Sequence, residues 1–170
     1  MSGLQNVQWI QARFWNVKVE KPKTPSGAPQ GTVWSGGPID WFRITLKICS
    51  DDLIPEEITK VFRVSPDESF QRGKPILRSD GSIKRMPKFG VWRVFIQPSD
   101  TDEWDCCEAA MELLARLPSN VEIWRNLSKK YEIIVSFALS LESSNKGFCL
   151  TNEFLKFIGE RGISADFDIY

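Results

Sequence analysis

Apolar and polar residues alternate most regularly in two segments of the chain, residues 41–49 and 131–141. In WFRITLKIC (41–49) the apolar residues at even positions alternate with Arg43, Thr45 and Lys47, and in YEIIVSFALSL (131–141) every odd position is large and mostly apolar. Successive side chains of a strand point to opposite faces of the sheet, so each segment predicts a strand with one apolar face. Weaker patterns predict further strands at 7–19, 32–34, 91–97, 121–124 and 164–170, the last with Ala165, Phe167 and Ile169 facing inward.

Apolar residues at helical spacing predict three helices, at residues 53–63, 99–117 and 151–161. Asp51 and Asp52 are placed to cap the first helix, and the apolar stripe of the second begins at Trp104. For the third helix, Thr151 is a suitable N-cap and Gly162 a suitable residue just after the C-terminus. The predicted buried stripe of this third helix is Phe154, Leu155 and Ile158.

The order of these elements predicts an α+β fold with two layers, a mostly antiparallel sheet and about three helices on one face. A doubly wound parallel sheet would need strands that are apolar on both faces, which the alternating strands are not. The polar residues 125–130 favour a hairpin between strands 121–124 and 131–141. Residues 41–170 are expected to form a single domain. Residues 1–40, a strand followed by a Pro- and Gly-rich loop at 20–31, are expected to be an N-terminal extension packed on it.

Several short motifs resemble a known family. They are Asp51-Asp52-Leu53, Pro55-Glu56-Glu57-Ile58-Thr59, Val64-Ser65-Pro66, Arg72-Gly73, Gly90-Val91-Trp92 and the terminal Asp166-Phe167-Asp168-Ile169-Tyr170. The chain resembles, over roughly residues 41–170, a family of small, mostly bacterial proteins known only as a domain of unknown function. The resemblance implies a compact bacterial cytosolic domain, and it implies no activity, cofactor or catalytic residue.

The composition excludes several kinds of site and mechanism but identifies no activity. The chain has 22 basic and 22 acidic residues, a formal net charge of zero, and no histidine, so mechanisms that need an imidazole are excluded. Its four cysteines include no C-x-x-C pair, so we expect no metal site, no cofactor, and thiols that serve as small apolar packing. Without a signal peptide or a long apolar run, we expect a cytoplasmic protein that does not enter membranes.

Basic residues gather in one segment of this neutral chain. Residues 71–90 hold six basic residues against one acidic residue, whereas residues 100–112 hold six acidic residues and no basic one. A basic loop of this kind suits an acidic protein surface or a nucleic acid, and the plain alternative is a solvated loop whose field the acidic segment partly cancels. The six candidate partner-binding residues are Arg72, Lys74, Arg78, Lys84, Arg85 and Lys88.

Seven tryptophans are a surplus for a domain of this size. Trp41 and Trp124 fall on the otherwise polar faces of their predicted strands, where an exposed indole suits partner binding. The alternative is that the N-terminal extension folds back and covers that face. Trp41 and Trp124 therefore complete the set of candidate partner-binding residues.

These observations favour a non-enzymatic binding protein of the bacterial cytosol whose partner is another protein. An immunity-type inhibitor of a toxin or nuclease is one specific version of this interpretation. The first alternative is a nucleic-acid or anion binder that uses residues 72–88. The second is an enzyme that uses carboxylates such as Asp166 and Asp168, although we predict no catalytic residue because no nucleophile with a base and no phosphate-binding loop is present.

Overall fold

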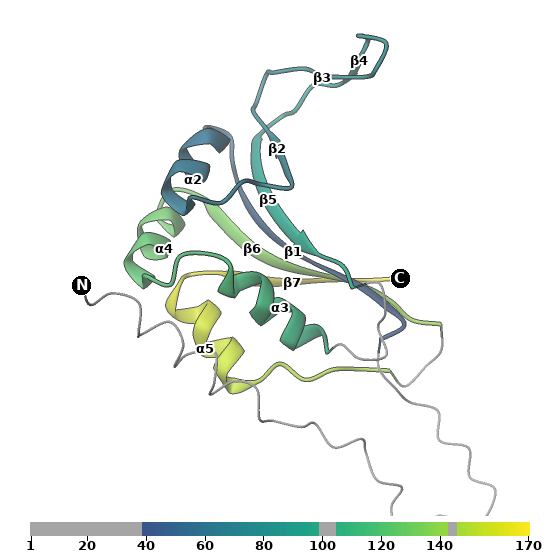
Figure 1. Ribbon diagram of the computed structural model, residues 1–170, viewed down its shortest axis with the longest axis vertical. Helices are drawn as coiled ribbons and strands as arrows, with labels where there is room; N and C mark the ends of the chain where they lie inside the picture. Colours follow the sequence, from purple (N-terminus) through teal and green to yellow (C-terminus); the bar gives the residue numbers. More distant parts are fainter. Residues whose placement is uncertain (1–38, 99–104, 143–145) are drawn as a thin grey trace, which may run out of the picture. The chain divides into compact units, whose positions relative to one another are not determined.

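A five-stranded sheet forms one layer of the protein, with its strands in the order β2-β5-β1-β6-β7 (Figure 1). The computed structural model describes residues 39–98, 105–142 and 146–170. The three pairings that involve β1 or β2 are antiparallel, whereas β6 and β7 run parallel. The predicted mostly antiparallel sheet is therefore confirmed. The strands are β1 Trp41–Ser50, β2 Glu68–Phe70, β5 Gly90–Ile96, β6 Glu132–Ser140 and β7 Ser164–Ile169.

Four helices among the described residues supply buried side chains to the core beneath this sheet. They are α2 Pro55–Phe62, α3 Cys106–Ala115, α4 Val121–Ser128 and α5 Asn152–Glu160. The apolar faces of the alternating strands can be buried only against such a second layer. The α+β class predicted from the sequence is thus confirmed, with one helix more than expected.

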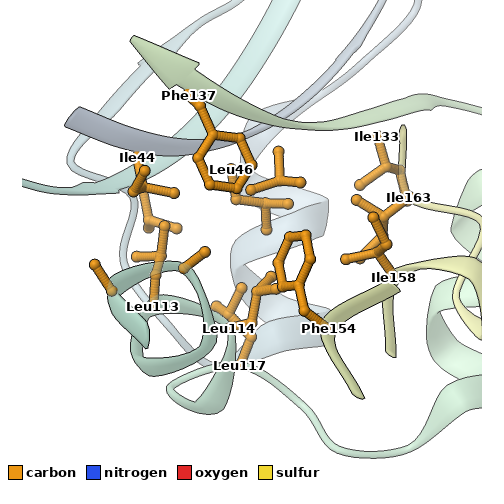
Figure 2. Packing of buried hydrophobic residues seen from close by; sticks show 14 of the residues in the cluster. Ile44, Leu46, Leu113, Leu114, Leu117, Ile133, Phe137, Phe154, Ile158 and Ile163 are labelled. Atoms are coloured by element: carbon orange, nitrogen blue, oxygen red, sulfur yellow. The ribbon is translucent and has the colours of Figure 1, made fainter. Parts of the chain in front are cut away.

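The sheet's apolar face is built by register. Leu46 lies opposite Val94 on one side and Val135 on the other, so the three strands place apolar side chains in the same row. Figure 2 shows Leu113 and Phe154 reaching this row from the helices. Each fully buried side chain of this size contributes about 1.5–3 kcal/mol relative to an exposed one. The opposite face of the sheet, which we call the open face, carries the polar residues of the same strands.

The predicted strand at 121–124 and its hairpin with 131–141 are wrong. Residues 121–128 form α4, and the Asn120 side-chain oxygen accepts a hydrogen bond from the Glu122 N–H at 3.0 Å as its cap. Val121, Trp124 and Leu127 recur at a spacing of three, which a helix turns toward one side. Strand β6 pairs instead with β1 and β7.

Two helix starts also differ from the sequence predictions. Helix α2 begins after Ile54, which makes no side-chain cap, with Pro55 at its first position, so Asp51 and Asp52 lie in the preceding turn. Helix α3 begins at Cys106, because the Asp105 carboxylate accepts from two backbone N–H groups and caps it there. Residues 99–104 of the predicted helix, with Trp104, lie outside the described residues, as do residues 1–38 and the predicted strands 7–19 and 32–34.

The last helix and strand agree with prediction in position but not in burial. Thr151 caps α5 and Gly162 adopts the left-handed φ of 66° after it, as expected. Leu155, however, is exposed and not part of the buried stripe. Every residue of β7 is exposed, although the Phe167 ring stacks on the buried Phe137 at 5.0 Å between centroids. The inward direction of Phe167 is therefore right, but its burial is incomplete.

Candidate interaction surface

A two-stranded ribbon projects from the sheet between β2 and β5 (Figure 1). We call residues 71–89 the arm; they contain β3 Ile76–Leu77 and β4 Ile83–Arg85, which pair antiparallel with a bulge. Nearly every residue of the arm is exposed. The segment that the sequence predicts as an irregular loop is thus a hairpin that presents its side chains to solvent.

The tip of the arm is held by its own hydrogen bonds. The Arg78 N–H donates to the Ser82 carbonyl oxygen at 2.8 Å, and Gly81 supplies the left-handed φ of 81° that the turn needs. The Asp80 carboxylate accepts from the Ser82 N–H at 2.9 Å and from its hydroxyl at 2.6 Å, and the hydroxyl bond lowers the pKa of Asp80. The Arg78 guanidinium donates to the Ser82 hydroxyl and to the Ile83 carbonyl at 3.2 Å each. The arm therefore has a defined turn without help from the domain.

The six basic residues predicted as partner-binding all lie on the arm, but in different settings. Arg72 pairs with Asp51 at 3.1 Å, Arg78 is occupied at the tip, and the Arg85 guanidinium lies 5.0 Å from the Phe70 ring centroid. The other three, Lys74, Lys84 and Lys88, are exposed and form no ion pair with any residue that the structure describes. These three lysines can therefore contact a partner without first breaking an ion pair with a described residue.

The apolar side chains of the arm were not predicted from the sequence as part of an interaction surface. Eleven large hydrophobic residues are exposed in the described part of the chain, and four of them lie here, which marks the arm as more than a solvated loop. Leu77 lies opposite Ile83 across the ribbon, so two of the four are neighbours. The four are Leu77, Ile83, Met86 and Phe89.

Four of the motifs that carry the family resemblance meet at the base of the arm. The Trp92 indole N–H donates to the Thr59 hydroxyl at 3.1 Å and ties α2 to β5. Gly90 lies so close to Leu53 that an added Cβ would be 2.3 Å from the Leu53 carbonyl oxygen. The Arg72–Asp51 ion pair spans the same corner. These motifs therefore build the junction between arm, helix and sheet.

Trp41 lies on the open face of the sheet, as predicted, and is 36% exposed. The Arg43 guanidinium lies 6.0 Å from the Trp41 ring centroid and 5.0 Å from that of Phe95, and it donates to the Gln97 side-chain oxygen at 2.9 and 2.5 Å. These contacts hold Arg43 between two aromatic rings.

This arrangement continues toward the arm. Arg93 pairs with Glu68 and lies 5.9 Å from the Phe70 ring centroid, and Phe70 also receives Arg85 of the arm. From the arm, along β2 and β5, to the first residue of β1, arginine side chains thus alternate with aromatic rings. The ring of Phe70 could not be assigned to this face from the sequence, because β2 is only three residues long.

The prediction that Trp124 is exposed for partner binding is wrong. It lies in α4, is 0% exposed, and its indole N–H donates to the Pro118 carbonyl oxygen at 2.7 Å. The ring packs on Phe62 with 4.8 Å between centroids. The error follows from reading a short helix as a strand, which assigned the side chain to the opposite layer. Trp124 is a core residue.

The acidic pair of the alternative enzyme hypothesis lies on β7. Asp166 and Asp168 share the open face, since they pair with Ser136 and Ala138, and the Tyr170 hydroxyl donates to Asp168 at 2.5 Å. That bond raises the pKa of Tyr170. Within residues 39–98, 105–142 and 146–170, no three histidine, cysteine, aspartate or glutamate side chains gather as metal ligands.

The cysteines are free thiols in the structure, and three of the four are buried. Burial raises the pKa of Cys106 to about 12, with a further contribution from the neighbouring Asp105 carboxylate. Burial also raises the pKa of Cys49 and Cys107. The packing role expected for the cysteines fits these three, whereas Cys149 is exposed.

Among the described helices, none has the length and apolar character needed to cross a membrane.

Comparison with known proteins places most of the chain in one family. No curated protein and no solved structure matches the chain. The family model for the domain of unknown function DUF4279 matches residues 40–170, which include all the motifs at the base of the arm and the C-terminal strand. The chain therefore belongs to the DUF4279 family.

Proposed function

We propose that the protein is a non-enzymatic binding protein and that its arm contacts an acidic surface of a partner protein. The observation that supports this most strongly is the combination, on one projecting hairpin, of four exposed apolar side chains with three lysines that form no ion pair with a described residue. An isolated two-stranded ribbon gains little stability from exposing such side chains, whereas burying them in an interface is favourable. The lysines would then steer and orient the encounter.

The mixed character of the arm favours a protein over a nucleic acid as its partner. Interfaces between proteins bury apolar side chains at their centre and place charge at the rim. Nucleic-acid binders are in most cases basic as a whole and offer several stacking rings. Here the whole chain is neutral and Phe89 is the one exposed aromatic residue of the arm. The nucleic-acid interpretation is therefore the second candidate.

A narrower version of the proposal is an immunity-type inhibitor of a toxin, acting in a reducing compartment such as the bacterial cytoplasm. The free thiols fit such a compartment. A nuclease has a basic substrate site, which would repel the arm. An inhibitor of this kind would therefore meet its toxin through an acidic surface with an apolar centre, outside any site that binds nucleic acid.

The experiment is site-specific photo-crosslinking in cells that produce the full chain. A photoreactive residue replaces Leu77 on the arm, which is 57% exposed, and the matched control carries it at Leu155 on α5, which is 46% exposed. We expect a protein adduct from position 77 and not from position 155. The adduct should fall about tenfold when Lys74, Lys84 and Lys88 are all changed to Glu, because repulsion replaces attraction at the rim.

The control for that charge change reverses three exposed lysines elsewhere, Lys60, Lys129 and Lys130, and should leave the adduct unchanged. Equal adducts from the arm and from α5, or equal losses in the two reversed variants, would contradict the proposal. Tight binding of a labelled single-stranded oligonucleotide of about twenty nucleotides, lost steeply with salt and with the arm reversal, would establish the second candidate instead.

A further inference from the structure

Strand β7 is an edge of the sheet with one neighbour among the described residues. It pairs with β6 from Ser164 to Ile169 in unbroken register, and all six of its residues are exposed. Natural edge strands are often blocked by proline, by a bulge, by charged side chains or by a covering element. Strand β7 has no proline, no bulge and no lysine, and its charged side chains are Asp166 and Asp168. Among the described residues, no strand pairs with its outer edge.

The backbone of β7 offers hydrogen-bonding groups on its outer side. The Tyr170 N–H donates to the Leu139 carbonyl oxygen, and the Tyr170 carbonyl oxygen accepts from Leu141, so both groups of Tyr170 point to β6. The direction alternates along a strand. The N–H and carbonyl groups of Ala165, Phe167 and Ile169 therefore point outward, away from β6.

The two faces of β7 differ in chemistry. On the core side, Phe167 is 43% exposed and Ile169 is 60% exposed. A strand added at this edge would therefore bury more of the apolar surface of these two side chains. On the open face, Asp166 forms no ion pair with another described residue, and Asp168 accepts one hydrogen bond from Tyr170. A complementary strand would carry apolar residues on one side and basic residues on the other.

A second copy of the chain does not meet this requirement. In an antiparallel β7–β7 pair with the two-fold axis at Phe167, Asp166 of one copy would lie opposite Asp168 of the other. Moving the axis to Asp166 or Asp168 places that residue opposite itself. Like charges directly opposite destabilise a strand pair. The carboxylates therefore disfavour the three self-paired registers centred on Asp166, Phe167 and Asp168, whereas they would attract a basic strand.

We propose that β7 binds an extended segment of a partner protein in which basic residues alternate with apolar ones. Backbone hydrogen bonds to the outward groups of β7 would hold the segment, and Asp166 and Asp168 would select its basic side. This site is separate from the arm and does not rest on the function proposed for it.

The experiment uses the full chain and the blocked, labelled peptide Lys-Val-Lys-Val-Lys-Val-Lys, with Glu-Val-Glu-Val-Glu-Val-Glu as the matched peptide. We expect the basic peptide to bind at least about tenfold more tightly than the acidic one by fluorescence anisotropy. Hydrogen exchange should show new protection at the outward amides of Phe167 and Ile169. The Ala165→Pro variant, which removes an outward N–H that β6 does not use, should weaken binding, since proline is tolerated at a sheet edge.

Charge is tested separately from backbone pairing. The double change Asp166→Asn and Asp168→Asn should abolish the preference for the basic peptide, whereas Glu56→Gln with Glu57→Gln on α2 removes the same charge and should preserve it. If Ala165→Pro unfolds the protein, this pair of variants decides alone. Equal binding of the two peptides, protection outside β7, or a dimer of the free chain that Ala165→Pro dissociates would overturn the proposal.

Discussion

Replacing Trp124 by alanine tests whether α4 belongs to the core. The indole is fully buried, packs on Phe62 with 4.8 Å between centroids, and donates to the Pro118 carbonyl oxygen at 2.7 Å. Truncating a buried large aromatic residue costs about 3–5 kcal/mol. The loss of the hydrogen bond to Pro118 places the expected cost in the upper part of that range. A typical domain has a free energy of unfolding of about 5–15 kcal/mol, so the variant should be severely destabilised.

Two further variants make this prediction quantitative. Trp124→Phe retains most of the apolar contact but leaves the Pro118 carbonyl without its donor, at a cost of about 1–2 kcal/mol. Trp41→Ala on the open face should cost clearly less than Trp124→Ala, since Trp41 is 36% exposed whereas Trp124 is fully buried. Urea unfolding followed by circular dichroism gives all three values. A Trp41→Ala variant that is as destabilised as Trp124→Ala would refute the assignment of the two side chains to opposite faces.

Three other changes test separate features. Gly90→Ala should destabilise by at least about 1–3 kcal/mol in the same urea assay, because the new methyl group meets the Leu53 backbone, and an unchanged midpoint would contradict the close approach. Arg63→Gly should stabilise by up to about 1 kcal/mol, because Arg63 adopts a left-handed φ of 57° that glycine adopts without strain; a lower melting temperature would argue against it. Iodoacetamide at pH 8 should modify Cys149 first and leave Cys106 unmodified, since burial keeps the pKa of that thiol near 12, and mass spectrometry of peptides would reveal any early reaction at Cys106.

Long alternating segments made the centre of the fold predictable. Strands β1 and β6 have nine or more residues, so the even and odd positions separate clearly into a core face and an open face. The same separation placed Trp41 correctly on the open face. The caps at Thr151 and Gly162 likewise located the two ends of α5, because each acts through its own backbone geometry.

Short elements could not be assigned in this way. Four residues at 121–124 fit a strand and a helix equally well, and the deciding signal was the capping Asn120 before them. In the arm, β3 and β4 have two and three residues, too few to show a period, so composition revealed the charge but not the hairpin. The exposure of Phe167 had no local signal, because it depends on β7 being at the edge of the sheet.

The central position of β1 has a consequence for how the chain folds during synthesis. Ile48 pairs with Trp92, made 44 residues later, and with Ile133, made 85 residues later. At about 5–20 residues per second, the ribosome needs several seconds between β1 and its second neighbour. Both edges of β1 lack a native partner until β5 has been made, and the edge that β6 will occupy lacks one for the whole interval. Nascent chains of this topology should therefore depend on chaperones at this stage, and substitutions that slow translation between β1 and β6 should lower the yield of folded protein more than identical delays after β7.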